Sequence, residues 1–183
     1  MSEVTQKDFG LLIAYLLPGF VALWGVSIFS PTVQTWLGET PPNSPTVGGF
    51  FYVTIASVGA GLTVSVVRWA VIDTIHHWTG VRNPQWDFSR LQENVAAFDT
   101  LVQIHYHHYQ WCSNSLVSLS FLYLARRLSL GFWTSPLGWP DTGFLFLAVI
   151  LFAGSRDTLR KYYTRVAKLL GTEPTGATER RSL

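Results

Sequence analysis

Five histidines and one cysteine are the residues of this 183-residue chain whose types are most suited to chemistry. They fall in two short stretches. His76 and His77 follow Asp73 in "VIDTIHHWTG", and the other three histidines lie with the cysteine in "IHYHHYQWC". Imidazole, carboxylate and thiolate groups together are ligands that suit zinc or iron.

The spacing of these groups would place several of them on common helical faces. His105, His108 and Cys112 are separated by three and four residues, and Asp73 and His77 by four. Both stretches are expected at the same membrane interface, so they would be able to meet. One hypothesis is therefore a membrane enzyme or cofactor carrier with a divalent-metal or haem site at Asp73, His76, His77, His105 and His108.

A plainer interpretation is that these rings lie at the edge of a membrane. Trp, Tyr and His rings suit the headgroup zone, and Trp69, Trp78, Tyr106 and Trp111 surround the histidines. The sequence has no H-E-x-x-H, no paired C-x-x-C, no P-loop and no G-x-S-x-G. We therefore favour an interaction role over catalysis and expect no cofactor, with the metal site and pH sensing by the histidines as alternatives.

Composition and uncharged stretches predict a membrane protein. Charged residues make up 13% of the chain, against about 25% in an average soluble domain. Phe9–Phe29 and Val47–Val67 are runs of 21 residues without a charge, close to the roughly 20 residues that a helix needs to cross a bilayer. A third run, 100–125, is clearly apolar in its second half. A fourth uncharged run, 142–155, is long enough to cross the bilayer only if its helix continues towards Leu159.

The predicted fold is an all-α polytopic membrane protein with four transmembrane helices and a helical cytoplasmic extension. The spanning helices are expected at 9–29, 47–69, 105–127 and 142–159. External loops are expected at 30–46, which is proline-rich and should be irregular, and at 128–141. The cytoplasmic parts are expected to be an N-terminus at 1–8, a helical segment at 70–104 continuous with the third span, a basic amphipathic helix at 160–171 and a disordered tail at 172–183.

Basic residues orient this topology. With both termini in the cytoplasm, all of the 13 basic residues except Arg126 and Arg127 lie inside. Cytoplasmic loops of membrane proteins carry such an excess of Lys and Arg. The sequence therefore predicts a multi-pass protein of a bacterial-type inner membrane.

One long helix is predicted from about Arg90 to Ala125. Its large or apolar residues alternate at intervals of four and three, which is the pattern of a helix–helix seam. We interpret this seam as the surface through which the protein forms a homo-oligomer or joins a larger membrane complex. An oligomeric pore, with the serine-rich third spanning helix facing inward, is a variant of this hypothesis. The seam residues are Leu91, Val95, Phe98, Val102, His105, Tyr109, Cys112, Leu116 and Leu119.

Small residues mark one face of the second spanning helix. Ser57, Gly61 and Ser65 stand four apart, and such a face lets two helix backbones approach closely. Packing within the chain and self-association are both compatible with this pattern.

The last helical segment is strongly basic. Five basic residues and one acid lie between Arg156 and Leu170, and next to a membrane this pattern attracts anionic lipid headgroups. An anionic protein partner is an alternative, whereas nucleic acid is not expected from a basic helix alone. The residues predicted to make this contact are Arg156, Arg160, Lys161, Arg165 and Lys168.

Overall fold

The computed structural model describes residues 2–38, 47–81, 84, 86, 88–92 and 94–170, with the backbone alone for 2–12 and 90. The described chain is helical and has no strand, which confirms the all-α prediction for these residues. The elements are α1 (Ser2–Ser27), α2 (Pro31–Leu37), α3 (Val47–Arg68), η1 (Trp69–Asp73), α4 (Thr74–Trp78), η2 (Phe88–Arg90), α5 (Val95–Leu101), η3 (Val102–Tyr106), α6 (His107–Leu130) and α7 (Trp139–Leu169). η2 is a 3-10 turn, and η1 and η3 are π-helical.

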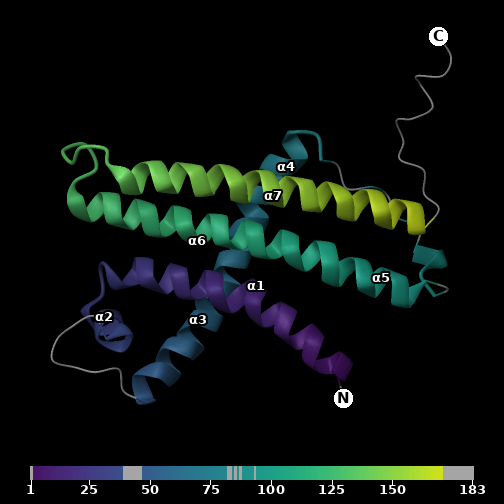
Figure 1. The fold of residues 1–183 in the computed structure, drawn as a ribbon, viewed down its shortest axis with the longest axis horizontal. Coiled ribbons are helices and arrows are strands. Elements are labelled where there is room, and N and C mark those ends of the chain that lie inside the picture. The colour runs from purple at the N-terminus through teal and green to yellow at the C-terminus, as the bar shows by residue number, and fades with distance from the viewer. Residues whose placement is uncertain are drawn as a thin grey trace, which may run out of the picture.

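Helices α6 and α7 form the long antiparallel pair that runs across Figure 1. Helix α1 contacts both α6 and α3, and α5 and η3 contact α7. Helix α3 continues without a break through η1 and α4, and this path crosses the α6–α7 pair obliquely. The end of α4 therefore lies beside the middle of α7, far from either end of that helix.

Two glycines let α1 and α3 cross in close contact. A Cβ atom on Gly19 would lie 1.8 Å from the carbonyl oxygen of Ser57, and one on Gly61 would lie 2.2 Å from that of Tyr15. Ser57 is buried in this contact. The small-residue face predicted on the second spanning helix thus packs within the chain, because only residues without bulk allow such close approach.

Local sequence explains where several helices begin and end. The predicted irregular loop at 30–46 contains α2, since Pro31 stands at the first helical position, where its fixed φ favours a helix. Gly38 ends α2 with a φ of 74°, and Gly131 follows α6 with a φ of 84°. Asp141 accepts the backbone N–H of Gly138 at 2.7 Å and so caps the start of α7. Residues 39–46 of that loop and the predicted disordered tail lie outside the described residues.

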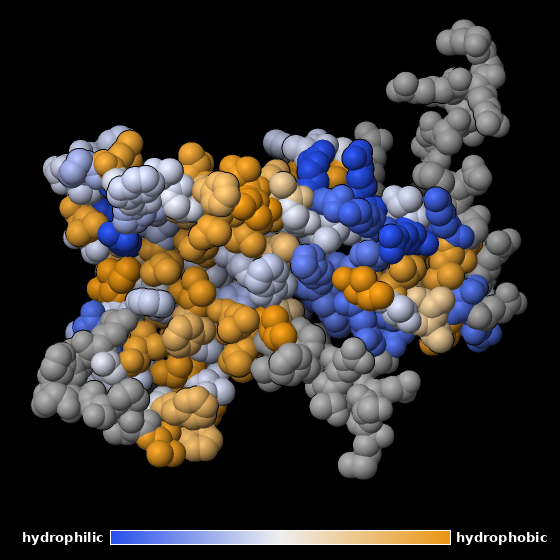
Figure 2. All heavy atoms as spheres, viewed as in Figure 1, coloured by the Kyte–Doolittle hydropathy of each residue, from blue (hydrophilic) through white to orange (hydrophobic). Residues whose placement is uncertain are grey.

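Apolar and hydrophilic side chains separate along the α6–α7 direction (Figure 2). Two helical stretches, Val47–Trp78 and Trp139–Leu169, are long and apolar enough to cross a membrane, and Ile13–Ser27 is a shorter apolar helix. Their apolar side chains mostly face outward, since only 17% and 11% of the most apolar windows of the two long stretches are buried. We call the part formed by Ile13–Ser27 of α1, α3, Tyr109–Leu130 and Trp139–Ser155 the apolar part.

The hydrophilic end, which we define as residues 95–106 and 156–170, has a small core of its own. Tyr162 and Val166 of α7 form a buried cluster with Leu170, which directly follows this helix. Phe98 of α5 and Trp86 pack against this cluster, and the rings of Trp86 and Tyr162 meet edge to face at 5.8 Å. The helical path predicted from Arg90 to Ala125 runs in the structure from Val95 to Leu130, as α5, η3 and α6.

Candidate functional site

A buried ion pair lies where η1 meets α3 and α6. Arg68 is 5% exposed, and its Nη1 lies 4.0 Å from Oδ1 of Asp73. The Tyr109 hydroxyl donates a hydrogen bond to the same carboxylate oxygen, and the Arg68 guanidinium lies 5.2 Å from the centroid of the Tyr109 ring. The nearby carboxylate and the ring face offset part of the cost of burying a cation.

Arg68 nevertheless keeps unmet hydrogen-bonding capacity. Its Nε and Nη1 make no hydrogen bond among the described residues. A charged side chain in an apolar helix is costly, so it marks a functional site by default. Sequence reasoning did not single out Arg68. The signal was present, because Arg68 is the lone charge that directly follows the uncharged run Val47–Val67.

His76 lies beside this ion pair and connects α4 to α7. Its Nε2 is 2.9 Å from Oγ of Ser155, and its ring is 6.2 Å from that of Tyr109 and 5.0 Å from that of Phe152. A serine and a histidine at hydrogen-bond distance would suit nucleophilic catalysis. Both residues are 0% exposed, however, and no substrate can reach a group that is closed off in this way. The pair therefore joins two helices.

Arg156 makes a second connection between the same two helices. Its guanidinium donates to the Thr79 hydroxyl and, at 2.6 Å, to the Thr79 carbonyl oxygen. Thr79 follows the last residue of α4, and a cation is stabilising at a helix C-terminus because carbonyl groups point outward there. Together with the Ser155 contact, this fixes the end of α4 against α7.

The two π turns decide which side chains face this site. A π turn is wider than an α turn, so the residues after it point in directions that α-helical spacing does not predict; one inserted residue corresponds to about 100° of rotation. After η1, His76 is buried and His77 is exposed. Within and after η3, His105 is buried and His108 is exposed. Asp73 is bonded to Tyr109, whereas His77 faces outward, so the two predicted ligands do not share a contact.

The five residues predicted to bind metal are spread over separate contacts. Asp73 and His76 take part in the cluster described above. His105 accepts a hydrogen bond from Nη1 of Arg165 at 2.5 Å, while His77 and His108 face outward. In the part of the chain that is described, no group of three His, Cys, Asp or Glu residues is placed to hold a metal ion.

His105 is a neutral acceptor in this arrangement. Burial of the ring, followed by the positive charges of Arg165 and Lys161, holds the pKa of His105 below its ordinary value. The ring therefore stays unprotonated at neutral pH and can accept a hydrogen bond from the Arg165 guanidinium. Because His105 lies in η3 at the hydrophilic end, this contact joins that element to α7.

Most of the predicted seam faces α7 of the same chain. Six seam residues contact α7 or its buried clusters, namely Leu91, Phe98, Val102, His105, Tyr109 and Cys112. Val95 is exposed, and Leu119 lines a groove described below. These contacts leave little of the seam available to a second copy of the chain.

The polar residues of α6 are also covered within the chain. Ser113, Asn114 and Ser118 are each 0% exposed. Nδ2 of Asn114 donates to the carbonyl oxygen of Ala14 at 3.0 Å, which ties α6 to α1. Such hydrogen bonds join helices where water is absent. These three polar side chains of α6 thus lie inside one chain.

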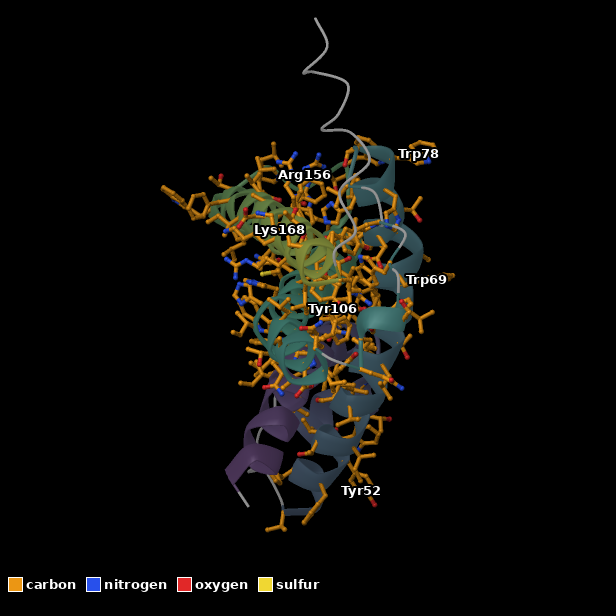
Figure 3. All side chains as sticks on the ribbon, turned by 90° about the vertical axis from the view of Figure 1, so that its right-hand side faces the viewer. Tyr52, Trp69, Trp78, Tyr106, Arg156 and Lys168 are labelled. Carbon is orange, nitrogen blue, oxygen red and sulfur yellow. The ribbon has the colours of Figure 1, made fainter. Side chains whose placement is uncertain are left out.

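The predicted basic residues lie along the second half of α7, and Figure 3 shows Arg156 and Lys168 on this helix. Arg160, Lys161, Arg165 and Lys168 are exposed, and Lys161 pairs with Asp157 at 2.6 Å. Arg165 and Lys168 border an open groove of about 570 Å³ whose other wall is formed by Ala97, Thr100 and Leu101 of α5. The hydrophilic end therefore presents outward positive charge.

No protein-family model, curated protein or solved structure matches the chain. The geometry of the molecule itself must therefore indicate its role. That geometry consists of a closed polar cluster that joins α3, α4, α6 and α7, with a basic extension beyond it.

Proposed function

We propose that this protein is a multi-pass membrane protein that acts through interaction and assembly rather than through catalysis. The observation that carries the proposal is the exposure of its most apolar helices. In a soluble protein, an apolar helix of this length is buried in the core, whereas here most of it faces outward. The exposed apolar residues include Phe50, Ile55, Leu62 and Val66 of α3 and Leu145, Phe146, Val149 and Ile150 of α7. A bilayer would cover these surfaces.

Four helices would cross the bilayer in this proposal. They are α1, α3, α6 from about Tyr109 onwards, and α7 up to about Ser155. Helix α6 is less apolar than the others because its polar side chains bond to α1 inside the chain, while Phe121, Leu124 and Leu128 face outward. The distribution of basic residues favours a bacterial-type inner membrane with both termini in the cytoplasm.

The hydrophilic end would then be a preformed cytoplasmic extension. The cluster of Tyr162, Val166 and Leu170 holds α5 and η3 against α7, so this end does not need to fold on a partner. Its exposed basic residues would meet anionic lipid headgroups or an anionic partner. Self-association, or membership in a larger complex, would use faces other than the seam, and the outward apolar face of α3 is one such face.

The test is the native mass of the protein purified in mild detergent, with alkaline extraction of the membranes and elemental analysis of the same preparation. The proposal expects resistance to extraction and a defined oligomer, or a co-purified complex, without bound metal. Release into the soluble fraction would overturn the membrane assignment. A monomer that carries about one equivalent of metal or haem would overturn the interaction role and favour a metal site at the histidines.

A further inference from the structure

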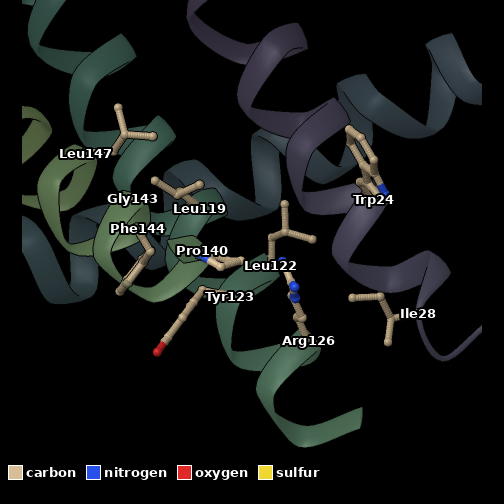
Figure 4. Close-up of a pocket in the computed structure, with 10 residues that line it drawn as sticks. All are labelled: Trp24, Ile28, Leu119, Leu122, Tyr123, Arg126, Pro140, Gly143, Phe144 and Leu147. Carbon is tan, nitrogen blue, oxygen red and sulfur yellow. The ribbon is translucent and has the colours of Figure 1, made fainter. Parts of the chain in front are cut away.

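A groove of about 400 Å³ lies between α1, α6 and α7 in the apolar part, next to the α6–α7 turn (Figure 4). Its walls come from all three helices, and the apolar residues that line it are Trp24, Ile28, Leu119, Leu122, Phe144 and Leu147. The rings of Tyr123 and Phe144 stack at 4.0 Å between centroids, which makes one wall rigid. The groove is suited to a slender apolar group.

One end of this groove is polar. A second hollow of about 160 Å³ adjoins it and shares Tyr123, Arg126 and Pro140 with it. Arg127 in that hollow already has partners. Its guanidinium donates to backbone carbonyl oxygens of the α6–α7 turn, and the distance to the oxygen of Phe132 is 3.0 Å. It also lies 3.6 Å from the Asp141 carboxylate.

Arg126 differs from its neighbour. It is exposed, and within the described chain its guanidinium makes no hydrogen bond or ion pair. The groove therefore ends at a positive charge, and the nearby Asp141 carboxylate is paired with Arg127. An apolar groove that ends at a positive charge is suited to a ligand with an apolar tail and an anionic head.

We propose that this groove binds one anionic phospholipid. An acyl chain would lie along Leu119, Leu122 and Leu147, and the phosphate would accept hydrogen bonds from Arg126. Arginine presents several N–H donors in a geometry that matches phosphate oxygens. A zwitterionic phospholipid also carries a phosphate, but its own cation competes with Arg126, so the site discriminates by net charge. This inference rests on the membrane location in the proposed function.

The experiment titrates the detergent-purified protein with phosphatidylglycerol or phosphatidylcholine. Bound lipid is counted by native mass spectrometry, and the midpoint of thermal unfolding is measured in the same samples. We expect one retained phosphatidylglycerol and a raised midpoint, and a weaker response to phosphatidylcholine. Arg126→Gln removes charge-assisted hydrogen bonds and should weaken phosphatidylglycerol binding roughly tenfold.

A second variant tests the apolar part of the site. A Cβ on Gly143 would meet nothing within 4 Å, so Gly143→Leu can place its side chain in the groove without a backbone clash and should weaken binding of the acyl chain. Ala153→Leu adds bulk to an exposed position of the same helix, away from the groove. This control should not change the retained lipid.

The outcomes separate this inference from the membrane assignment. A protein that alkaline extraction releases would overturn the proposed function and this inference with it. An integral protein that binds both lipids equally, or that loses phosphatidylglycerol equally with Arg126→Gln and Ala153→Leu, would overturn the lipid site alone. Loss confined to Arg126→Gln and Gly143→Leu would support it.

Discussion

At the scale of single residues, the stability of the site depends on how the buried charge of Arg68 is compensated. A guanidinium that leaves water loses its hydration, and only a close partner of opposite charge compensates for this loss. Asp73 supplies that charge, and Tyr109 fixes the carboxylate by hydrogen bonding. The three side chains come from α3, η1 and α6, so the charge balance also holds these elements together.

Asp73→Asn should therefore be strongly destabilising. It leaves the charge of Arg68 buried without its counter-ion, and breaking a buried pair in this way costs about 3–5 kcal/mol. The double variant Arg68→Met, Asp73→Asn should recover much of the loss, since neither charge remains. The measurement is the free energy of unfolding in detergent.

The matched control for this prediction is Asp157→Asn. It breaks the exposed Asp157–Lys161 pair, and exposed pairs contribute less than about 1 kcal/mol. If the variant at Asp73 unfolds no more readily than the one at Asp157, the buried pair does not have the role described.

His105 should make stability depend on pH. Its pKa is lowered in the folded chain, so the unfolded chain takes up a proton more readily. The contribution of the neutral His105 ring to the free energy of unfolding is complete above the ordinary histidine pKa of about 6.5. It declines as the pH falls below that value. His105→Asn keeps a side-chain acceptor near Arg165 but does not titrate, so it should flatten this decline.

Thermal unfolding midpoints at pH values from 7.5 to 5.5, taken in about one-unit steps around the ordinary pKa of histidine, would measure this effect. His108→Asn, at an exposed ring of the same segment, is the control variant. Equal slopes of midpoint against pH in the wild-type protein and in His105→Asn would show that the Arg165 contact does not couple His105 to folding.

At the scale of elements, the crossing of α1 and α3 depends on the absence of side chains. Gly19 and Gly61 each face a backbone carbonyl of the opposite helix. Backbone atoms cannot move aside as a flexible side chain can, so any added atom must push the two helices apart. The position of α3, and with it that of Arg68 and η1, therefore depends on this crossing.

Gly61→Ala should destabilise the protein by about 1–3 kcal/mol, which is the usual cost of overpacking. Gly59→Ala is the control, because a Cβ there would meet nothing within 4 Å, and Ala stabilises an α-helix by about 0.5–1 kcal/mol relative to Gly. Unfolding free energies of the two variants give the comparison. Similar values for both would contradict the close α1–α3 contact.

Some of these elements could be predicted from the sequence, and the reason is physical. The spacing of large residues from Leu91 to Leu119 is a property of one helix, so it shows which side of that helix is buried. It does not show what covers that side, which here is mostly α7. The two π turns have no comparable signal, and for this reason the grouping of His105 with His108 failed.

The buried polar cluster around Arg68 and Asp73 shows in the same way what local sequence patterns do not predict. Asp73 and His76 attracted attention because of their chemistry, and both lie in the cluster. Ser155 and Tyr109 gain their roles from residues distant in the sequence, and no local pattern predicts such pairs. Arg68 is different, because a charge directly after a long apolar run is a signal that could have been used.

At the scale of the whole molecule, the distribution of hydropathy along α6 and α7 is the main clue to function. The polar cluster of Arg68, Asp73 and His76 and the contact of Arg156 with Thr79 lie between the apolar part and the basic hydrophilic end. In a membrane, this is where hydrocarbon gives way to headgroups, and Trp69 and Trp78 point outward from η1 and α4 (Figure 3). Such rings favour the interface.

In the proposed topology, the chain crosses a membrane with its basic end on one side and its α6–α7 turn on the other. The most direct measurement is labelling of single cysteines with a membrane-impermeant maleimide. Trp133→Cys lies in the exposed turn and Lys168→Cys at the exposed basic end. Cys112 is 4% exposed and would be replaced by serine.

We predict that the cysteine at position 133 is labelled in cells whose inner membrane is intact. The cysteine at position 168 should be labelled only after that membrane is permeabilised. Labelling of both positions under the same condition, or recovery of the protein in the soluble fraction, would contradict this topology.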